Sequence, residues 1–134
     1  MNALFKSILC PIDLDELYLD ALELSKNLAQ QNNAQLYVLN VMSEFDSEHG
    51  WSAGSRISLK EQARTALLGK VRYEFVIRTG EVVHEILAAT RVLEADLVVI
   101  PTHGRRGLRS LVLGSVAERI VRESPVPVLT LRAP

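Results

Sequence analysis

Short apolar runs alternate along the chain with longer stretches whose apolar residues recur at helical spacing. The runs are rich in β-branched residues and short enough to be buried strands, whereas the longer stretches place apolar side chains on one face of a helix. The pattern predicts strands at 7–13, 35–41, 73–77, 96–100 and 128–131, and helices at 18–29, 57–68, 81–94 and 115–124. Pro11 is expected near the end of the first strand, because it cannot donate to a sheet ladder.

This regular alternation predicts the fold class. Continuous apolar strands separated by helices favour parallel pairing, with helices on both faces of the sheet. Right-handed crossovers then favour an α/β, doubly wound, five-stranded sheet, formed by residues 1–134 as one domain. Ligands of such sheets bind beyond the carboxyl ends of the strands, where the strand order reverses. The ends of the first, second and fourth strands are therefore the places to search for chemistry.

Composition narrows the possible functions. Hydrophobic residues make up 48% and charged residues 23%, and 15 basic against 16 acidic residues give a net charge of −1. This balance excludes the strong basicity of a nucleic-acid-binding protein. A single cysteine, Cys10, excludes an internal disulfide and a zinc site built on cysteines. No apolar run has the length of a membrane span and no secretory signal is recognisable, so we expect a cytoplasmic protein without a membrane partner.

The segment after the fourth strand, residues 101–113, combines glycines with arginines. Gly104, Gly107 and Gly114 permit backbone conformations and close approaches that side chains would block. Gly114 and Ser115 stand at the first turn of a predicted helix, whose unpaired amides and positive dipole end favour an anion. A capped helix after a flexible turn would produce the same glycines, so their spacing alone leaves both interpretations open.

A longer pattern resembles the signature of the universal stress protein family. Its nucleotide-binding members have glycine, two residues, glycine, nine residues, then glycine and serine or threonine. Here the pattern is Pro101, two residues, Gly104, nine residues, then Gly114 and Ser115. The opening strand through Asp13, the pair Asn40 and Val41, and the stretch from 95 to 129 are also similar to the family. The resemblance covers nearly the whole chain and is weakest over 42–68.

The resemblance implies the strand order 3-2-1-4-5 and a site for ATP or AMP, with Mg²⁺ bridging the phosphates. It implies a regulatory role in the stress response, with at most slow ATPase or autophosphorylation activity. Asp13 would accept hydrogen bonds from the ribose or the base, Val41 would pack on adenine, and Ser115 would bind a phosphate oxygen. The residues expected to bind the nucleotide are Asp13, Val41, Pro101, His103, Gly104, Arg105, Gly114, Ser115 and Val116.

Pro101 departs from the family pattern, since it replaces the first signature glycine with a ring that lacks an N–H. The alternative function is therefore a nucleotide-independent interaction protein. In either case we expect a homodimer through the last strand, an edge whose apolar residues are Val126, Val128, Leu129 and Leu131.

Two other proteins with alternating strands and helices fit poorly. A response-regulator receiver needs an aspartate after the third strand and a lysine after the fifth, and both are missing. A flavodoxin-like carrier needs a phosphate loop after the first strand, where this chain is acidic and has no glycine.

Overall fold

The computed structural model describes residues 3–13, 18–42, 53–102 and 114–131. Its five strands form one parallel sheet in the order β3-β2-β1-β4-β5, as expected. The order reverses between β1 and β4, which are neighbours in the sheet although two strands and the helices between them separate them in sequence. The strands are β1 (Ser7–Pro11), β2 (Gln35–Met42), β3 (Arg72–Thr79), β4 (Leu97–Pro101) and β5 (Val128–Leu131).

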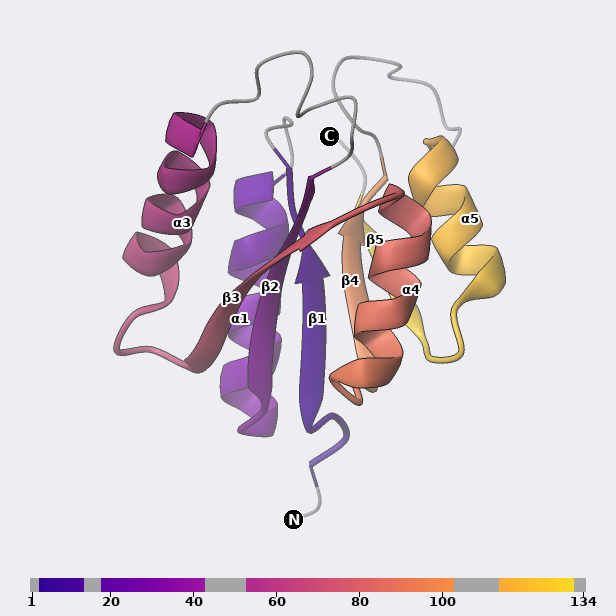
Figure 1. Ribbon diagram of the computed structural model, residues 1–134. Coiled ribbons are helices and arrows are strands. Elements are labelled where there is room, and N and C mark those ends of the chain that lie inside the picture. Colours follow the sequence, from indigo (N-terminus) through magenta and orange to yellow (C-terminus); the bar gives the residue numbers. More distant parts are fainter. Residues whose placement is uncertain (1–2, 14–17, 43–52, 103–113, 132–134) are drawn as a thin grey trace.

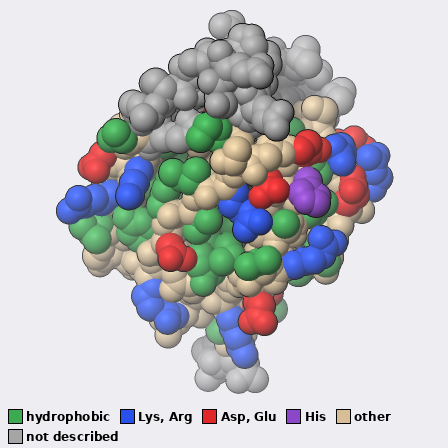
Figure 2. Space-filling model, in the orientation of Figure 1, with side chains coloured by type: hydrophobic (Ala, Val, Ile, Leu, Met, Phe, Trp, Pro, Cys, Tyr) green, Lys and Arg blue, Asp and Glu red, His purple; other side chains and the backbone are tan. Residues whose placement is uncertain are grey.

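Helices cover both faces of the sheet, with α1 and α3 on one face and α4 and α5 on the other (Figure 1). Figure 2, in the same orientation, shows hydrophobic side chains over β2 and β3 and charged side chains gathered over α4 and α5. None of the helices in the described ranges is long and apolar enough to cross a bilayer. The helices are α1 (Tyr18–Asn32), α3 (Ala53–Leu67), α4 (Val82–Val92) and α5 (Ser115–Glu123).

Alternate residues of each central strand enter two different cores. In β1, Ile8 and Cys10 pack beneath α1 and α3, whereas Leu9 points to the core beneath α4 and α5. In β4, Val99 packs beneath α1 and α3, whereas Val98 points to the core beneath α4 and α5. This follows from the period of two along a strand, and it explains why a strand with helices on both faces is apolar at every position.

The strand ends differ from the expected boundaries near the proposed site. The first strand ends at Pro11 and not at Asp13, while β4 continues one residue further than expected and includes Pro101. Pro101 is opposite Leu131 of β5, and the ladder continues beyond it because the N–H of Thr102 donates to Leu131 (2.9 Å). Proline is tolerated at a strand end, where few ladder bonds depend on its missing donor.

Gly80 makes the tight connection from β3 to α4. Its φ is +150°, and a Cβ built on it would lie 2.9 Å from an oxygen of Glu85. The positive φ therefore requires glycine, and a Cβ there would also displace the side chain of Glu85. Glu85 in turn holds Arg78 of β3 by an ion pair of 2.8 Å, so the start of α4 is anchored to the neighbouring strand.

Candidate functional site

A cavity of about 190 Å³ lies at the carboxyl end of the sheet, where the strand order reverses. Its walls come from the ends of β1, β2 and β4, from the first turns of α4, and from the start of α5. This is the position expected for a ligand of a doubly wound sheet. The lining residues are Pro11, Ile12, Asp13, Leu39, Val41, Val82, Ile86, Ile100, Pro101, Thr102, Gly114, Ser115, Val116 and Ala117.

The structure brings together the candidate residues that it describes. Six of them line this one cavity: Asp13, Val41, Pro101, Gly114, Ser115 and Val116. They come from the ends of three strands, or just beyond them, and from the start of one helix. The other three candidates, His103, Gly104 and Arg105, lie outside the described residues.

Asp13 is exposed at the rim of the cavity, two residues beyond the end of β1. The backbone before it is held firmly: the N–H of Ile12 donates to Leu39 (2.8 Å), and the buried amide of Asn40 donates to the carbonyl of Ile12 (2.9 Å). A carboxylate placed in this way can accept hydrogen bonds from hydroxyl or amine groups of a ligand. Asn40 thus positions Asp13, a role that the sequence analysis did not assign to it.

The wall of the cavity between β2 and α4 is apolar. Val41 at the end of β2 shares it with Val82 and Ile86 from the first two turns of α4. All three side chains belong to the core beneath α4 and α5. The sequence analysis did not assign Val82 and Ile86 to the site, because periodicity does not separate a residue that lines a cavity from one that fills a core. This wall suits the face of a flat, weakly polar group.

The first turn of α5 faces the cavity without a side-chain cap. Gly114 is the N-cap residue, and within the described ranges no side chain accepts from the helix amides there. The N–H of Glu118 donates to Gly114 (2.9 Å), so the amides of residues 115–117 come before the first bond of the helix. Unpaired amides and the positive end of the helix dipole favour an anion, and the exposed Ser115 adds a hydroxyl.

The backbone of Gly114 corrects one expectation. Its φ is −61°, which any residue adopts, so the chain does not need glycine there for an unusual conformation. Gly114 lines the cavity. The carbonyl of Thr102 accepts from the Gly114 N–H, which fixes the start of α5 to the end of β4.

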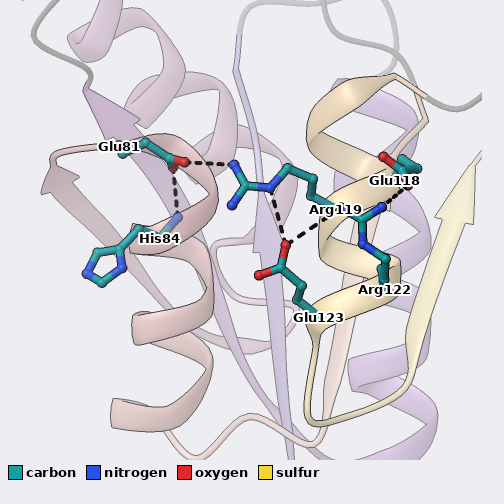
Figure 3. Close-up of polar contacts among 6 residues, drawn as sticks. All are labelled: Glu81, His84, Glu118, Arg119, Arg122 and Glu123. Atoms are coloured by element: carbon teal, nitrogen blue, oxygen red, sulfur yellow. Dashed lines mark hydrogen bonds and ion pairs between the residues drawn. The ribbon is translucent and has the colours of Figure 1, made fainter.

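One ion pair among the described residues, Glu81 with Arg119, joins the start of α4 to α5, and others lie along α5 itself (Figure 3). Arg119 lies between Glu81 (3.0 Å) and Glu123 (3.2 Å), and Arg122 binds Glu118. Glu81 is also the N-cap of α4 and accepts from the backbone N–H of His84 at 2.8 Å. That hydrogen bond, supported by Arg119, lowers the pKa of Glu81 below its usual value of 4.5. The pair between Glu81 and Arg119 thus connects two helices that line the cavity.

Metal binding has no support from side-chain clusters in the described ranges. No group of three His, Cys, Asp or Glu side chains is close enough there to hold an ion. Cys10 is fully buried within β1, as the apolar run predicts.

Comparisons with known proteins agree with this architecture. The chain is 32% identical to universal stress protein MJ0531 of Methanocaldococcus jannaschii, over 98% of this chain and 84% of that protein. A solved universal stress protein in complex with cAMP covers 96% of this chain and 97% of its own, with a TM-score of 0.72 and 20% identity. One from Archaeoglobus fulgidus in complex with dAMP covers 93% and 96%, with a TM-score of 0.70 and 17% identity. These two solved structures are similar to this chain in fold.

The match to a family model covers almost the whole chain. The model described as the universal stress protein family matches residues 4–132, which include every strand, every described helix and the whole lining of the cavity. Together with the strand order and the relative in Methanocaldococcus jannaschii, this match shows that the chain belongs to the universal stress protein family.

Proposed function

We propose that this protein binds an adenine nucleotide, ATP or AMP, in the cavity at the carboxyl end of the sheet, and that it acts as a regulatory module in the stress response. The observation that carries the proposal is the arrangement of three features around one cavity. Asp13 lies at the end of β1, an apolar wall with Val41 lies between β2 and α4, and the uncapped start of α5 lies beside Ser115.

Each feature matches one part of the ligand. The carboxylate of Asp13 accepts from ribose hydroxyls or the base, and the apolar wall packs on the adenine ring. The amides of α5 and the Ser115 hydroxyl bind phosphate oxygens. The cavity is smaller than the 300–1,000 Å³ or so that is usual for a site enclosing a drug-sized ligand, so it holds part of the nucleotide.

Two fold relatives give this proposal further support, because their structures contain cAMP and dAMP. Magnesium would bind through the phosphates of the nucleotide, since Asp13 is the only cavity-lining residue in the described part that carries a carboxylate.

Calorimetric titration of ligand-free protein with ATP and with adenosine tests the proposal. Replacing Ser115 with alanine should lower the affinity for ATP about tenfold or more. The reason is that a hydrogen bond to a charged group contributes about 1.5–3 kcal/mol. Adenosine should be unaffected by that change, whereas Asp13→Ala should weaken both ligands. Ser58→Ala, on the exposed surface of α3 across the sheet, is the matched control and should change neither affinity.

Pro101 allows the alternative function to be tested in the same experiment. Its ring stands where nucleotide-binding relatives have glycine, so Pro101→Gly should tighten ATP if the ring obstructs the site. Absence of heat with ATP for both the natural protein and Pro101→Gly would contradict nucleotide binding. The nucleotide-independent interaction protein would then be the function to pursue.

We also propose a homodimer through β5, which would serve either function. In the described part of the chain β5 pairs only with β4, and Leu129 on it is 38% exposed. Two such edges can pair antiparallel about a twofold axis. Light scattering should show a dimer at micromolar concentration, and Leu129→Lys should shift it to monomer. Leu68→Lys, at an exposed leucine after α3, should leave the dimer intact; a natural protein that is only monomeric contradicts the proposal.

A further inference from the structure

Thr102 is buried at the end of β4, lines the cavity, and has a side-chain oxygen without a partner. Its exposure is 2%, and Oγ1 makes no hydrogen bond within the part of the chain that the structure describes. Its backbone, in contrast, is fully used: the N–H donates to Leu131 and the carbonyl accepts from Gly114. Among the described residues only one other buried side-chain oxygen is unpartnered, that of Ser25 in α1.

A buried hydroxyl without a partner destabilises the folded protein, because it loses its hydrogen bonds to water and gains none. Valine has nearly the same shape and would fill this position without that cost. Thr90 shows how the same fold treats a threonine of equal burial, since its hydroxyl donates to the carbonyl of Ile86 at 2.8 Å. Thr102, unlike Ser25, also lines the cavity, where a bound ligand can supply the missing partner.

The surroundings of Thr102 indicate which ligand group would pair with it. The carbonyl of Thr102 accepts a hydrogen bond from Gly114, the N-cap of α5. Its side chain therefore lies beside the helix terminus that favours an anion. The strand ends next to it are Pro11 and Pro101, and neither has a backbone N–H to offer. A hydroxyl in this position can supply a donor where the two prolines cannot.

We propose that Thr102 is a specificity-determining residue of this cavity, whose hydroxyl donates a hydrogen bond to a phosphate oxygen of the bound nucleotide. The inference rests on the proposed nucleotide site and deepens it, because it names the residue that separates nucleotide from nucleoside. A buried polar group that stays unpaired with the wrong ligand discriminates strongly between ligands. Thr102 thus compensates for the amide that Pro101 lacks.

The test compares Thr102→Val, which removes the hydroxyl and keeps the shape, with Thr102→Ser, which keeps the hydroxyl. We expect Thr102→Val to lower the calorimetric affinity for ATP about tenfold or more, which is the usual effect of losing a hydrogen bond to a charged group. Adenosine should bind Thr102→Val as it binds the natural protein, and Thr102→Ser should bind ATP normally. Without ligand, the melting temperature of Thr102→Val should equal or exceed that of the natural protein. Ser25→Ala, at the other unpartnered oxygen, should leave both affinities unchanged.

Each contrary result has a distinct meaning. If Thr102→Val binds ATP normally, or weakens ATP and adenosine alike, the phosphate contact is wrong and nucleotide binding stands. If the affinity for ATP falls in Thr102→Ser as much as in Thr102→Val, the methyl group matters and not the hydroxyl. That result overturns the inference. A melting temperature several degrees lower for ligand-free Thr102→Val would mean that the hydroxyl supports the fold, which also overturns it. If the natural protein binds neither ligand, the proposed function itself fails.

Discussion

Polar groups near the two ends of the parallel sheet are paired to different extents. At the amino end, side chains of the protein satisfy the backbone: Asp96 accepts from the N–H groups of Lys6 (2.8 Å) and Ser7 (3.2 Å). Asn32 does the same for Leu4 (3.0 Å) and Phe5 (3.2 Å). At the carboxyl end, α5 begins without a side-chain cap and Thr102 keeps an unpaired hydroxyl beside a cavity.

The difference indicates which end is built for stability and which for binding. Hydrogen bonds made within the protein contribute to folding whether or not a ligand is present. Groups left unpaired at a cavity cost stability, and a ligand that pairs with them recovers that cost as affinity. Substitutions of side chains that pair with the backbone should therefore change stability alone, and those of the unpaired groups at the cavity should change binding.

Asp96→Ala should have the largest effect on stability, because two backbone N–H groups near the start of β1 lose a charged acceptor. We expect the free energy of unfolding in urea to fall by about 2 kcal/mol, since a hydrogen bond to a charged group contributes roughly 1.5–3 kcal/mol and this site is partly exposed. Asp96→Asn keeps an acceptor and should lose less. The affinity for ATP should not change. A lower affinity in the folded variant would contradict the view that Asp96 serves stability alone.

The two buried threonines, Thr90 and Thr102, give a second test, in which the expected change in the free energy of unfolding is smaller. Thr90 lies near the end of α4 at the amino end of the sheet and its hydroxyl is bonded, whereas that of Thr102 is not. Thr90→Val should lower the free energy of unfolding by about 1 kcal/mol, the usual contribution of a hydrogen bond. Thr102→Val should leave the free energy of unfolding without a measurable decrease. Equal losses in urea denaturation would contradict the contrast.

Glu81 gives the smallest effect, because it is 56% exposed and solvent screens its ion pair. The hydrogen bond from the His84 N–H, with help from Arg119, lowers its pKa in the folded state below 4.5. Glu81 therefore stabilises the protein above pH 4.5, and this contribution is lost as the pH falls through the lower, folded-state value.

Glu81→Gln should accordingly have a lower urea midpoint than the natural protein at pH 7, with the difference shrinking in acid below pH 4.5. His84→Ala is the control, because the donor is the backbone N–H and survives that substitution. A difference between Glu81→Gln and the natural protein that stayed constant from pH 7 into acid would exclude the carboxylate as its source.

The element order and much of the candidate site could be predicted from the sequence. Periods of two and 3.6 residues are local properties, so alternating apolar runs and amphipathic stretches identified every strand and the described helices. The resemblance to the universal stress protein family added the strand order. It also selected Asp13 and Ser115, which both line the cavity.

Only the tertiary structure decided which residues share the cavity and which polar groups stay unpaired. Val82 and Ile86 have the periodicity of ordinary core residues, and they became cavity wall because α4 packs across the end of β2. The unpaired hydroxyl of Thr102 depends on neighbours from β5 and α5, which satisfy its backbone and not its side chain. Burial and hydrogen bonding between distant segments are non-local, so periodicity and motif spacing along the chain do not determine them.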